Sequence, residues 1–360
     1  MKKICFQISN IELCGGTERV CAEIANGLSG RGYDVTILTL GRSSKSYFAL
    51  NPQIKVIALR RNFLLYKLRY KKWLTIFLLR LFVRLYNMDI IIDVDTLLSN
   101  ETLKAIRGTK CKHIAWDHYN YHFCINDKRR TEALDLIKKY SNALVVLTKA
   151  DKEQYVEKED MLVSFVSQIY NPLTFEIDKV ISHVQKKVLA VGRFAMQKGF
   201  DLLLKSWKKV EDRVNDWELH IYGYNGEDTG DVFSTYDSLN LKRVKLHCST
   251  SDIAEKFAES SIFVLSSRFE GLGIVLLEAC ASSLPIVSYN CPYGPSEIVK
   301  DGENGFLVEP ENIDKLAESL IILILDEEKR KSMGEKSFEI AKKFSKDEVV
   351  DQWVNLIDSL

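Results

Sequence analysis

The segment KICFQISNIELCGGTERVCAEIANGLSGRGYDVTILTL, residues 3–40, contains the structural unit from which the fold of this chain is built. Residues 3–9 are mostly apolar and predict a β-strand, which a glycine-containing loop follows. Residues 17–28 carry apolar side chains at helical spacing, and residues 35–40 predict a second strand. This β-loop-α-β order is typical of parallel strands joined by a helix that covers the sheet.

The alternation of strand and helix patterns continues along the chain and is interrupted once. In the N-terminal part, further strands are expected at residues 54–59, 90–94, 112–116 and 143–147. The Asn171-Pro172 step and the polar stretch to Gln185 break the pattern, and we interpret them as a linker. After the linker, strands are expected at residues 188–191, 218–222, 244–247, 262–266 and 286–288, and helices at residues 200–213, 253–260, 274–282 and 313–325.

Two successive sheets of one type predict an α/β fold with two Rossmann-like domains facing a cleft. The length of 360 residues agrees, because a single core stops growing near about 250 to 300 residues. We expect an N-terminal domain at residues 1–172, a C-terminal domain at residues 186–345, and a helix at residues 346–360 that packs back on the first domain. Ligand-binding loops should follow the carboxyl ends of the strands.

The formal net charge of +1 conceals two oppositely charged halves. Residues 1–170 contain 27 Lys and Arg against 17 Asp and Glu, whereas the remaining residues contain 23 against 32. The net charges are therefore +10 and −9. A basic half favours a negatively charged partner, for which nucleic acid, anionic lipid and a phosphorylated substrate are candidates.

Eight cysteines are scattered along the chain, with no CxxC pair and no histidine-spaced cluster of the kind that zinc sites use. We interpret them as buried thiols in a reducing compartment. The apolar run at residues 4–8 is too short for the apolar region of a signal peptide, and no uncharged span of 18 residues is long enough to cross a bilayer. The chain is therefore expected in the cytoplasm.

One segment combines basic and apolar side chains in an unusual way. Residues 35–88 contain eleven Lys and Arg and no acidic residue, and residues 63–86 read FLLYKLRYKKWLTIFLLRLFVRLY. Such a helix can lie in a membrane interface on anionic headgroups, although a core helix with a solvated basic face has the same composition. Nucleic acid is less favoured, because no recognised binding motif accompanies the charge. The residues expected to contact the membrane are Lys67, Arg69, Lys71, Lys72, Trp73, Arg80 and Arg84.

The segment SSRFEGLGIVLLEA, residues 266–279, has the pattern of a ligand-binding turn. A strand ends at the serines, a glycine-rich turn follows, and an apolar helix begins near Ile274. Backbone N–H groups at such a helix start can bind phosphate or sugar oxygens. Glu270 and Glu278 would lie about 12 Å apart along a continuous helix, which is wider than the carboxylate pair of a glycosidase. They more plausibly bind different parts of one long ligand, such as a nucleotide sugar.

This segment resembles the E-x7-E signature of retaining glycosyltransferases of family 4, which have the two-domain glycosyltransferase-B fold. The resemblance extends over nearly the whole chain, and it implies that residues 1–172 bind the acceptor and residues 186–345 bind the nucleotide sugar. It includes Gly15-Gly16-Thr17-Glu18-Arg19, Val191-Gly192-Arg193, Lys198-Gly199, Gly294-Pro295-Ser296-Glu297 and Asp301-Gly302-Glu303-Asn304-Gly305.

The resemblance implies roles for individual residues. Glu278 looks like the ribose-binding carboxylate, Arg193 and Lys198 look like a diphosphate clamp, and His118 matches the active-site histidine. The implied catalytic residues are Glu270, His118, Arg193 and Lys198. The implied donor-binding residues are Gly16, Arg193, Lys198, Glu270, Gly271, Leu272, Gly273, Ile274, Val275 and Glu278. Alternatively, Gly15-Gly16 is an ordinary strand-to-helix turn, His118 is structural, and Arg193 and Lys198 are solvated surface cations.

The resemblance implies retaining transfer of a hexose or N-acetylhexosamine from a UDP-sugar, without metal or other cofactor. The basic N-terminal half and residues 63–86 suggest that the acceptor is lipid-linked or a polysaccharide. The product would be a surface glycan such as O-antigen, capsule, exopolysaccharide or lipopolysaccharide, made at the inner face of the plasma membrane. A nucleotide-sugar epimerase and an inactive binding subunit remain alternatives. Asp93-Val94-Asp95 is a DxD that would bind a metal in transferases of another fold, and the first loop lacks the G-x-G-x-x-G of dehydrogenases.

Overall fold

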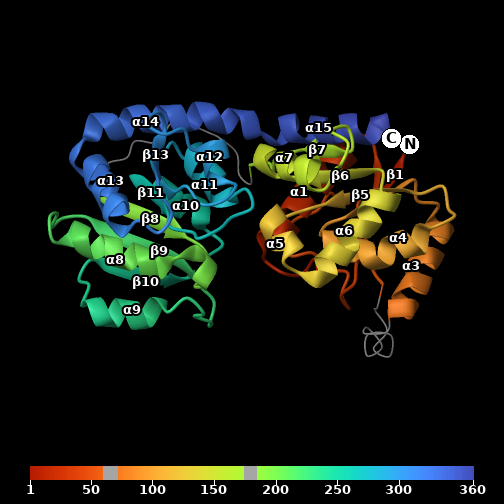
Figure 1. Ribbon diagram of the computed structural model, residues 1–360, viewed down its shortest axis with the longest axis horizontal. Helices are drawn as coiled ribbons and strands as arrows, with labels where there is room; N and C mark the ends of the chain where they lie inside the picture. The colour runs from red at the N-terminus through yellow and green to blue at the C-terminus, as the bar shows by residue number, and fades with distance from the viewer. Residues whose placement is uncertain (60–71, 174–184) are drawn as a thin grey trace. The chain divides into compact units, whose positions relative to one another are not determined.

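The computed structural model describes residues 1–59, 72–173 and 185–360, and the chain divides into two compact units. Unit 1 consists of Met1–Thr174 and Lys346–Leu360, and unit 2 consists of Phe175–Ser345. Each unit is a parallel sheet with helices on both faces (Figure 1). The α/β fold with two parallel-sheet domains that the sequence predicts is therefore confirmed.

The sheet of unit 1 has seven parallel strands in the order β3-β2-β1-β4-β5-β6-β7. Its strands β4 and β6 are fully buried and apolar except for Asp93, as expected for a parallel sheet covered by helices. The strands are β1 (Lys3–Ile8), β2 (Asp34–Thr39), β3 (Lys55–Ala58), β4 (Ile90–Asp93), β5 (Lys112–Trp116), β6 (Ala143–Val146) and β7 (Val166–Gln168).

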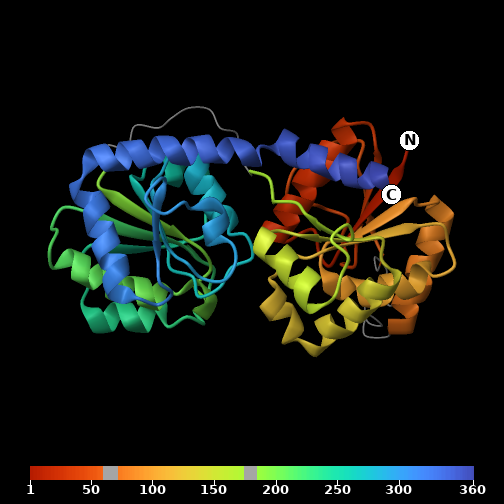
Figure 2. The same ribbon diagram turned by 45° about the horizontal axis from the view of Figure 1, so that its top comes forward.

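The helices of unit 1 lie in two layers. One layer packs α3, α4 and α6 on a core that includes Leu79, Leu103 and Ile137 together with Cys5 and Ile91 of the sheet. The other layer pairs α1 with the C-terminal helix α15, and Figure 2 shows these two helices on the opposite side of the sheet. The described helices are α1 (Gly16–Gly30), α3 (Lys72–Tyr86), the 3-10 turn η1 (Thr96–Leu98), α4 (Ser99–Ile106), α5 (Tyr121–Ile125), α6 (Lys128–Tyr140), α7 (Lys149–Lys158) and α15 (Lys346–Ser359).

The sheet of unit 2 has six parallel strands in the order β10-β9-β8-β11-β12-β13. Trp207 of α8 and Leu320 of α13 belong to the main apolar core on one face of this sheet. The strands are β8 (Lys187–Val191), β9 (Glu218–Tyr224), β10 (Val244–Cys248), β11 (Ile262–Leu265), β12 (Ile286–Tyr289) and β13 (Gly305–Val308). The helices are η2 (Met196–Lys198), α8 (Phe200–Glu211), α9 (Val232–Leu239), α10 (Ile253–Ala258), α11 (Ile274–Ala281), α12 (Pro295–Ile298), α13 (Ile313–Leu325), α14 (Glu327–Ala341) and η3 (Lys342–Phe344).

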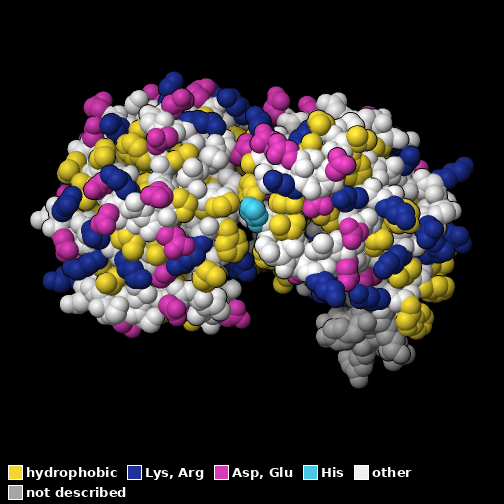
Figure 3. Space-filling model, viewed as in Figure 1, with side chains coloured by type: hydrophobic (Ala, Val, Ile, Leu, Met, Phe, Trp, Pro, Cys, Tyr) yellow, Lys and Arg dark blue, Asp and Glu magenta, His cyan; other side chains and the backbone are white. Residues whose placement is uncertain are grey.

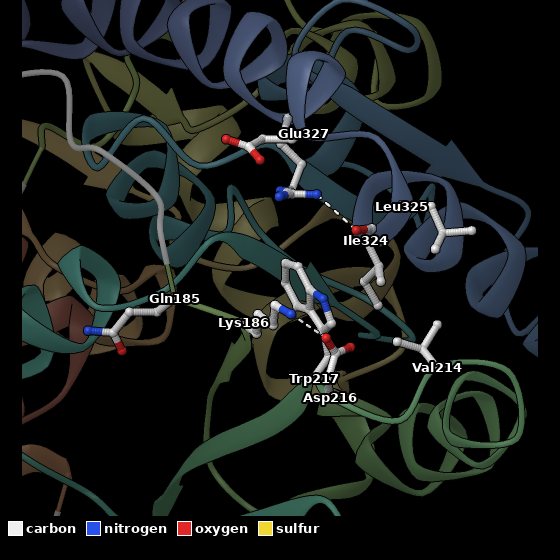
Figure 4. Close-up of a pocket in the computed structure, with 9 residues that line it drawn as sticks. Gln185, Lys186, Val214, Asp216, Trp217, Ile324, Leu325 and Glu327 are labelled. Carbon is white, nitrogen blue, oxygen red and sulfur yellow. Dashed lines mark hydrogen bonds and ion pairs between the residues drawn. The ribbon is translucent and has the colours of Figure 1, made fainter.

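The corner between α13 and α14 contains a pocket of about 320 Å³ (Figure 4). Arg330 donates from one guanidinium nitrogen to the carbonyl oxygens of Leu323 and Ile324, at 2.7 and 2.9 Å, and its guanidinium lies 5.0 Å from the ring of Trp217. Arg330 therefore satisfies carbonyl groups that the end of α13 leaves open. The main charged contacts here are internal, so we assign this pocket a structural role.

The helix α15 is held against unit 1 by a buried tryptophan and by ion pairs. Trp353 is fully buried, and its ring centroid lies 4.7 Å from that of Trp116 at the end of β5. Gly27 of α1 permits close approach, because a Cβ atom there would lie 2.4 Å from the side chain of Val350. At the margin of this contact, Arg31 forms ion pairs with Asp347 and Asp351.

Replacing Trp353 with Ala should lower the free energy of unfolding of unit 1 by about 3–5 kcal/mol, because the truncation leaves a cavity between α15, α1 and β5. Urea unfolding followed by circular dichroism measures this change. Trp73→Ala is the matched control, since this side chain is 64% exposed and its removal should change the free energy by less than about 0.5 kcal/mol. Equal effects of the two substitutions would contradict the packing role of Trp353.

Candidate functional site

In unit 2, hydrogen bonds tie the loop after β8 to the loop after β11. The backbone N–H of Arg268 donates to the carbonyl of Gln197 at 2.8 Å, and the side-chain amide of Gln197 donates to the carbonyl of Phe269 at 3.0 Å. The hydroxyl of Ser266 donates to the carbonyl of Lys198 at 2.9 Å. The two loops therefore act as one rigid element at the carboxyl edge of the sheet.

The same edge brings two of the predicted site residues into direct contact. The ammonium of Lys198 donates to Oε1 of Glu270 at 2.7 Å, and the hydroxyl of Ser267 donates to the same oxygen at 2.6 Å. The side chains of Lys198 and Glu270 are 15% and 6% exposed, so the pair is largely shielded from water. Gly192 lies beneath the lysine, since a Cβ atom there would come within 3.0 Å of its aliphatic chain.

Arg268 holds this arrangement in place, although its role is not among those predicted from the sequence. Its guanidinium binds both carboxylate oxygens of Asp201, at 2.9 and 2.8 Å, and donates to the carbonyl of Met196 at 2.7 Å. Bidentate Arg–carboxylate pairs restrict both partners strongly. Arg268 therefore connects the start of α8 to the turn that carries Lys198. In the sequence, its position within residues 266–279 is the feature that could have identified it.

The glycine-rich turn leads directly into α11. Gly273 has φ +80° and precedes the helix, a left-handed conformation that favours glycine. The turn packs against Gly294, because a Cβ atom there would lie 2.4 Å from the carbonyl oxygen of Leu272. The first backbone N–H groups of a helix have no partner within that helix, so those near Ile274 and Val275 can serve a ligand. Glu278 is buried within α11.

The remaining donor-site candidates differ in exposure. Arg193 lies at the end of β8, is exposed, and has no ion-pair partner among the described residues of the chain. Leu272 is 2% exposed, so its contribution to a ligand is restricted to its backbone. Gly271 lies beside it in the turn, and its carbonyl accepts from the N–H of Gly294. Gly16 lies in unit 1, where it is the first residue of α1.

His118 also lies in unit 1, directly after β5. Its ring centroid lies 4.4 Å from that of Trp116, and its Nε2 atom is shielded from solvent without a hydrogen-bond partner among the described residues. Burial lowers the pKa of His118 to about 4, although the nearby Asp95 acts in the opposite direction. The imidazole is therefore neutral at physiological pH.

The DxD sequence does not form an open metal site. Asp93 is fully buried and accepts hydrogen bonds from Ser99 and Thr102, and it also contacts Nε2 of His113 at 2.8 Å. Asp95 binds the guanidinium of Arg130 through both oxygens, at 2.8 and 3.1 Å. Both carboxylates already have strong protein partners. Within residues 1–59, 72–173 and 185–360, no group of three or more His, Cys, Asp or Glu is arranged to hold a metal ion.

The predicted membrane-contact residues fall into three groups. Lys67, Arg69 and Lys71 lie outside the described residues. Lys72, Trp73 and Arg84 are exposed on α3. Arg80 is half-buried, and its guanidinium donates to the carbonyls of Ala105 and Arg107, at 2.9 and 2.7 Å, so this side chain takes part in the contact between α3 and the end of α4.

The exposed face of α3 carries large apolar side chains, of which Trp73 alone is among the residues predicted to contact the membrane. Trp73, Phe77, Leu81 and Leu85 recur at intervals of four residues and are 64%, 59%, 43% and 68% exposed. Figure 3 shows Lys and Arg side chains together with hydrophobic ones on the side of the molecule where α3 lies. Among the described residues, no helix is long and apolar enough to span a membrane.

Comparison with known families matches both parts of the chain. The family model described as Glycosyltransferase Family 4 matches residues 14–172, and the model described as Glycosyl transferases group 1 matches residues 175–339. Together the two matches include all the site residues discussed above.

Individual proteins resemble the chain over its full length. A protein of Haemophilus influenzae described as an uncharacterized glycosyltransferase is 33% identical over 359 residues, which cover 99% of this chain and 100% of that protein. The amylovoran biosynthesis glycosyltransferase AmsD of Erwinia amylovora is 27% identical, over 99% of this chain and 100% of its own. A crystal structure of S. aureus TarM, in a complex that includes UDP and α-GlcNAc-glycerol, has a TM-score of 0.84 at 17% identity, covering 99% of this chain and 100% of that chain. The fold is therefore glycosyltransferase-B.

Because the folded chain holds His118 in its neutral form, the free energy of unfolding of unit 1 should decrease in acid. The unfolded chain binds a proton at this residue below pH about 6.5, whereas the folded chain does so only below about 4. The free energy of unfolding should therefore fall by up to about 3 kcal/mol as the pH decreases through this window, since a pKa difference of one unit corresponds to about 1.4 kcal/mol. Urea unfolding at several pH values measures the effect.

In this experiment, His118→Gln should flatten the dependence on pH between about 6.5 and about 4. His122→Gln is the control, because this side chain is exposed and its removal should leave the dependence unchanged. The assignment is wrong if His118→Gln and the unsubstituted protein lose stability in parallel.

Proposed function

Because the chain belongs to the group 1 glycosyltransferases, we propose that it moves a hexose or N-acetylhexosamine from a UDP-sugar to a lipid-linked or polysaccharide acceptor, with retention of configuration. The product is a surface glycan. The similarity to AmsD, a protein of amylovoran biosynthesis, supports this assignment. The presence of UDP in the TarM structure supports a UDP donor.

The contact between Lys198 and Glu270 is the observation that carries this proposal. Departure of UDP places negative charge on a phosphate oxygen, and fixed cations stabilise that charge more in the transition state than in the ground state. Lys198 is held by Glu270 in a partly dehydrated position, where electrostatic interactions are stronger than in water. Arg193 lies exposed at the end of the adjoining strand and supplies the second cation.

The geometry of Glu270 favours a reaction without a covalent intermediate. Its Oε1 atom already accepts hydrogen bonds from Lys198 and Ser267, which makes the carboxylate a poor nucleophile. In the front-face reaction that we propose, the leaving phosphate helps to remove the proton from the acceptor hydroxyl. The donor sugar is held by Glu270, and the ribose by Glu278. No metal is needed in this scheme, because Lys198 and Arg193 supply the positive charge.

Replacing Lys198 or Arg193 with Ala should lower the turnover of a UDP-sugar by about 10²–10³-fold, the usual effect of removing one transition-state donor. The donor is first identified by thermal stabilisation with a panel of UDP- and GDP-sugars, because a ligand bound by the native state alone raises its stability. Release of UDP then measures turnover. Lys205→Ala is the control, since this exposed lysine of α8 lies outside the site and its loss should have little effect.

The same assay separates the alternatives. EDTA should leave turnover unchanged, and a loss of activity would contradict metal-independent transfer. Incubation with UDP-N-acetylglucosamine and no acceptor should give no epimerised nucleotide sugar, whereas an epimerase would produce it. If no nucleotide sugar stabilised the protein, an inactive binding subunit would replace the enzymatic assignment.

We also propose that α3 contacts an anionic membrane surface that carries the acceptor. The apolar row Trp73, Phe77, Leu81 and Leu85 is suited to the acyl boundary, and Lys72 and Arg84 on the same helix are suited to anionic headgroups. A helix of this kind lies in the interface plane, which agrees with a chain that works on lipid-linked substrates.

Phe77→Glu and Leu81→Glu should each reduce co-sedimentation with vesicles of phosphatidylglycerol and phosphatidylcholine, because a carboxylate in the interface is repelled and must be desolvated. Binding of the unsubstituted protein should weaken between about 50 and 500 mM salt as the headgroup charge is screened. Leu162→Glu is the control, since Leu162 is 75% exposed elsewhere in unit 1. Failure of the unsubstituted protein to sediment at low salt would contradict the membrane assignment.

A further inference from the structure

Two aromatic side chains beside His118 are exposed in a way that the core of unit 1 does not explain. The rings of Tyr119 and Phe123 stack with their centroids 4.7 Å apart and their planes 15° from parallel. Tyr119 is 41% exposed and Phe123 is 40% exposed. A large apolar ring gains stability by leaving water, so a stacked pair that stays exposed is a candidate surface for binding.

The pair rests on a charged group that is itself fixed. The Arg130 guanidinium lies 4.1 Å from the ring centroid of Tyr119 and 5.4 Å from that of Phe123. Its nitrogens bind both oxygens of Asp95 and also donate to the hydroxyl of Thr96 at 3.1 Å. Arg130 is 4% exposed, so it orients the rings and is not itself available to a ligand in solvent.

The backbone beneath the two rings is also held by buried side chains. The carboxylate of Asp117 accepts from the N–H of Tyr119 at 3.0 Å and from the hydroxyl of Tyr155 at 2.7 Å. The side chain of Asn120 accepts from the N–H of Phe123 at 2.9 Å. Both ring-bearing positions are therefore rigid before any ligand arrives, which reduces the ordering cost of binding.

The surroundings indicate which kind of ligand the rings receive. The neighbouring His118 has an Nε2 atom that is shielded from solvent and has no partner among the described residues, and Asp95 connects this histidine electrostatically to the Arg130 that supports the rings. A pyranose ring has an apolar C–H face, which packs on an aromatic surface, and a rim of hydroxyls, which need polar partners. The exposed rings offer the apolar complement, and the same loop holds one buried polar atom, Nε2 of His118, that has no partner among the described residues.

From this geometry we propose that Tyr119 and Phe123 form a platform on which a pyranose ring of the acceptor stacks. The inference rests on the proposed glycosyltransferase function and names the residues of unit 1 that receive the acceptor sugar. The cations proposed to hold the donor diphosphate, Arg193 and Lys198, belong to unit 2. The platform therefore determines acceptor affinity and has no role in holding the donor diphosphate.

The test compares the unsubstituted protein with the variants Tyr119→Leu and Phe123→Leu. Each substitution keeps an apolar side chain but removes the aromatic face. The probes are octyl glycosides of glucose, galactose and N-acetylglucosamine, observed by saturation-transfer NMR without donor and then as acceptors with the identified nucleotide sugar. Each substitution should raise the acceptor KM by about 10-fold, as expected for loss of one aromatic contact. Hydrolysis of the nucleotide sugar without acceptor should stay within about two-fold of the unsubstituted rate.

Conservative and distant substitutions provide the controls. Tyr119→Phe and Phe123→Trp retain an aromatic face and should bind the octyl glycosides as the unsubstituted protein does. Tyr140→Ala removes a ring of α6 that is 38% exposed, and it should leave the acceptor KM unchanged. Thermal melting of each variant identifies any loss of folding.

Three results would overturn the platform. An unchanged acceptor KM in both leucine variants is one, and equal losses in the leucine and conservative aromatic variants is another. A rise in the KM of the nucleotide sugar alone would show that the rings bind the uracil base. The NMR measurement needs no donor, so failure of the proposed function, seen as no nucleotide-sugar turnover by the unsubstituted protein, is distinguishable from failure of the platform.

Discussion

The contact between Lys198 and Glu270 depends on the order of strands in the sheet of unit 2. The order changes direction between β8 and β11, since β9 and β10 extend to one side of this pair and β12 and β13 to the other. In open parallel sheets, the two loops at such a point leave the sheet next to each other and form the usual ligand site. One loop here carries Lys198 and the other carries Glu270. The hydrogen bonds of Ser266, Gln197 and Arg268 then hold the charged pair in a shielded position that would be costly without them.

Unit 1 has the same kind of strand order with a different distribution of charge. Its order changes direction between β1 and β4, and Asp93 and Asp95 lie at the end of β4. These carboxylates are bound by His113 and Arg130, so they stabilise the unit. In unit 2, by contrast, Arg193 remains exposed. This difference agrees with the proposal that unit 2 binds the charged donor.

The sequence predicts the elements whose pattern reflects burial and misses features that depend on tertiary contacts. The helix expected at residues 313–325 matches α13, because its apolar face has a regular helical period. The strand β7 has three residues, two of them polar, and β13 begins with Gly305, so neither has a strand pattern of sufficient length. Arg268 and Arg80 also have roles that depend on tertiary contacts. A sequence shows a cation but not the carbonyl or carboxylate that binds it, and that partner decides whether the cation faces a ligand, a membrane or the protein itself.

The last helix of the chain connects this packing to the candidate site in unit 1. Trp353 of α15 contacts Trp116, which in turn contacts the ring of His118, with centroid distances of 4.7 and 4.4 Å. Burial is the main cause of the lowered pKa of His118, so α15 contributes through Trp116 to keeping this imidazole neutral. Helix α15 follows unit 2 in the sequence but belongs to unit 1. It thus contributes to the electrostatics of a loop more than 200 residues earlier in the chain. Trp353 and Trp116 hold α15 against unit 1, and the same two side chains help to bury His118. A change that loosens α15 should therefore raise the pKa of His118 toward its ordinary value.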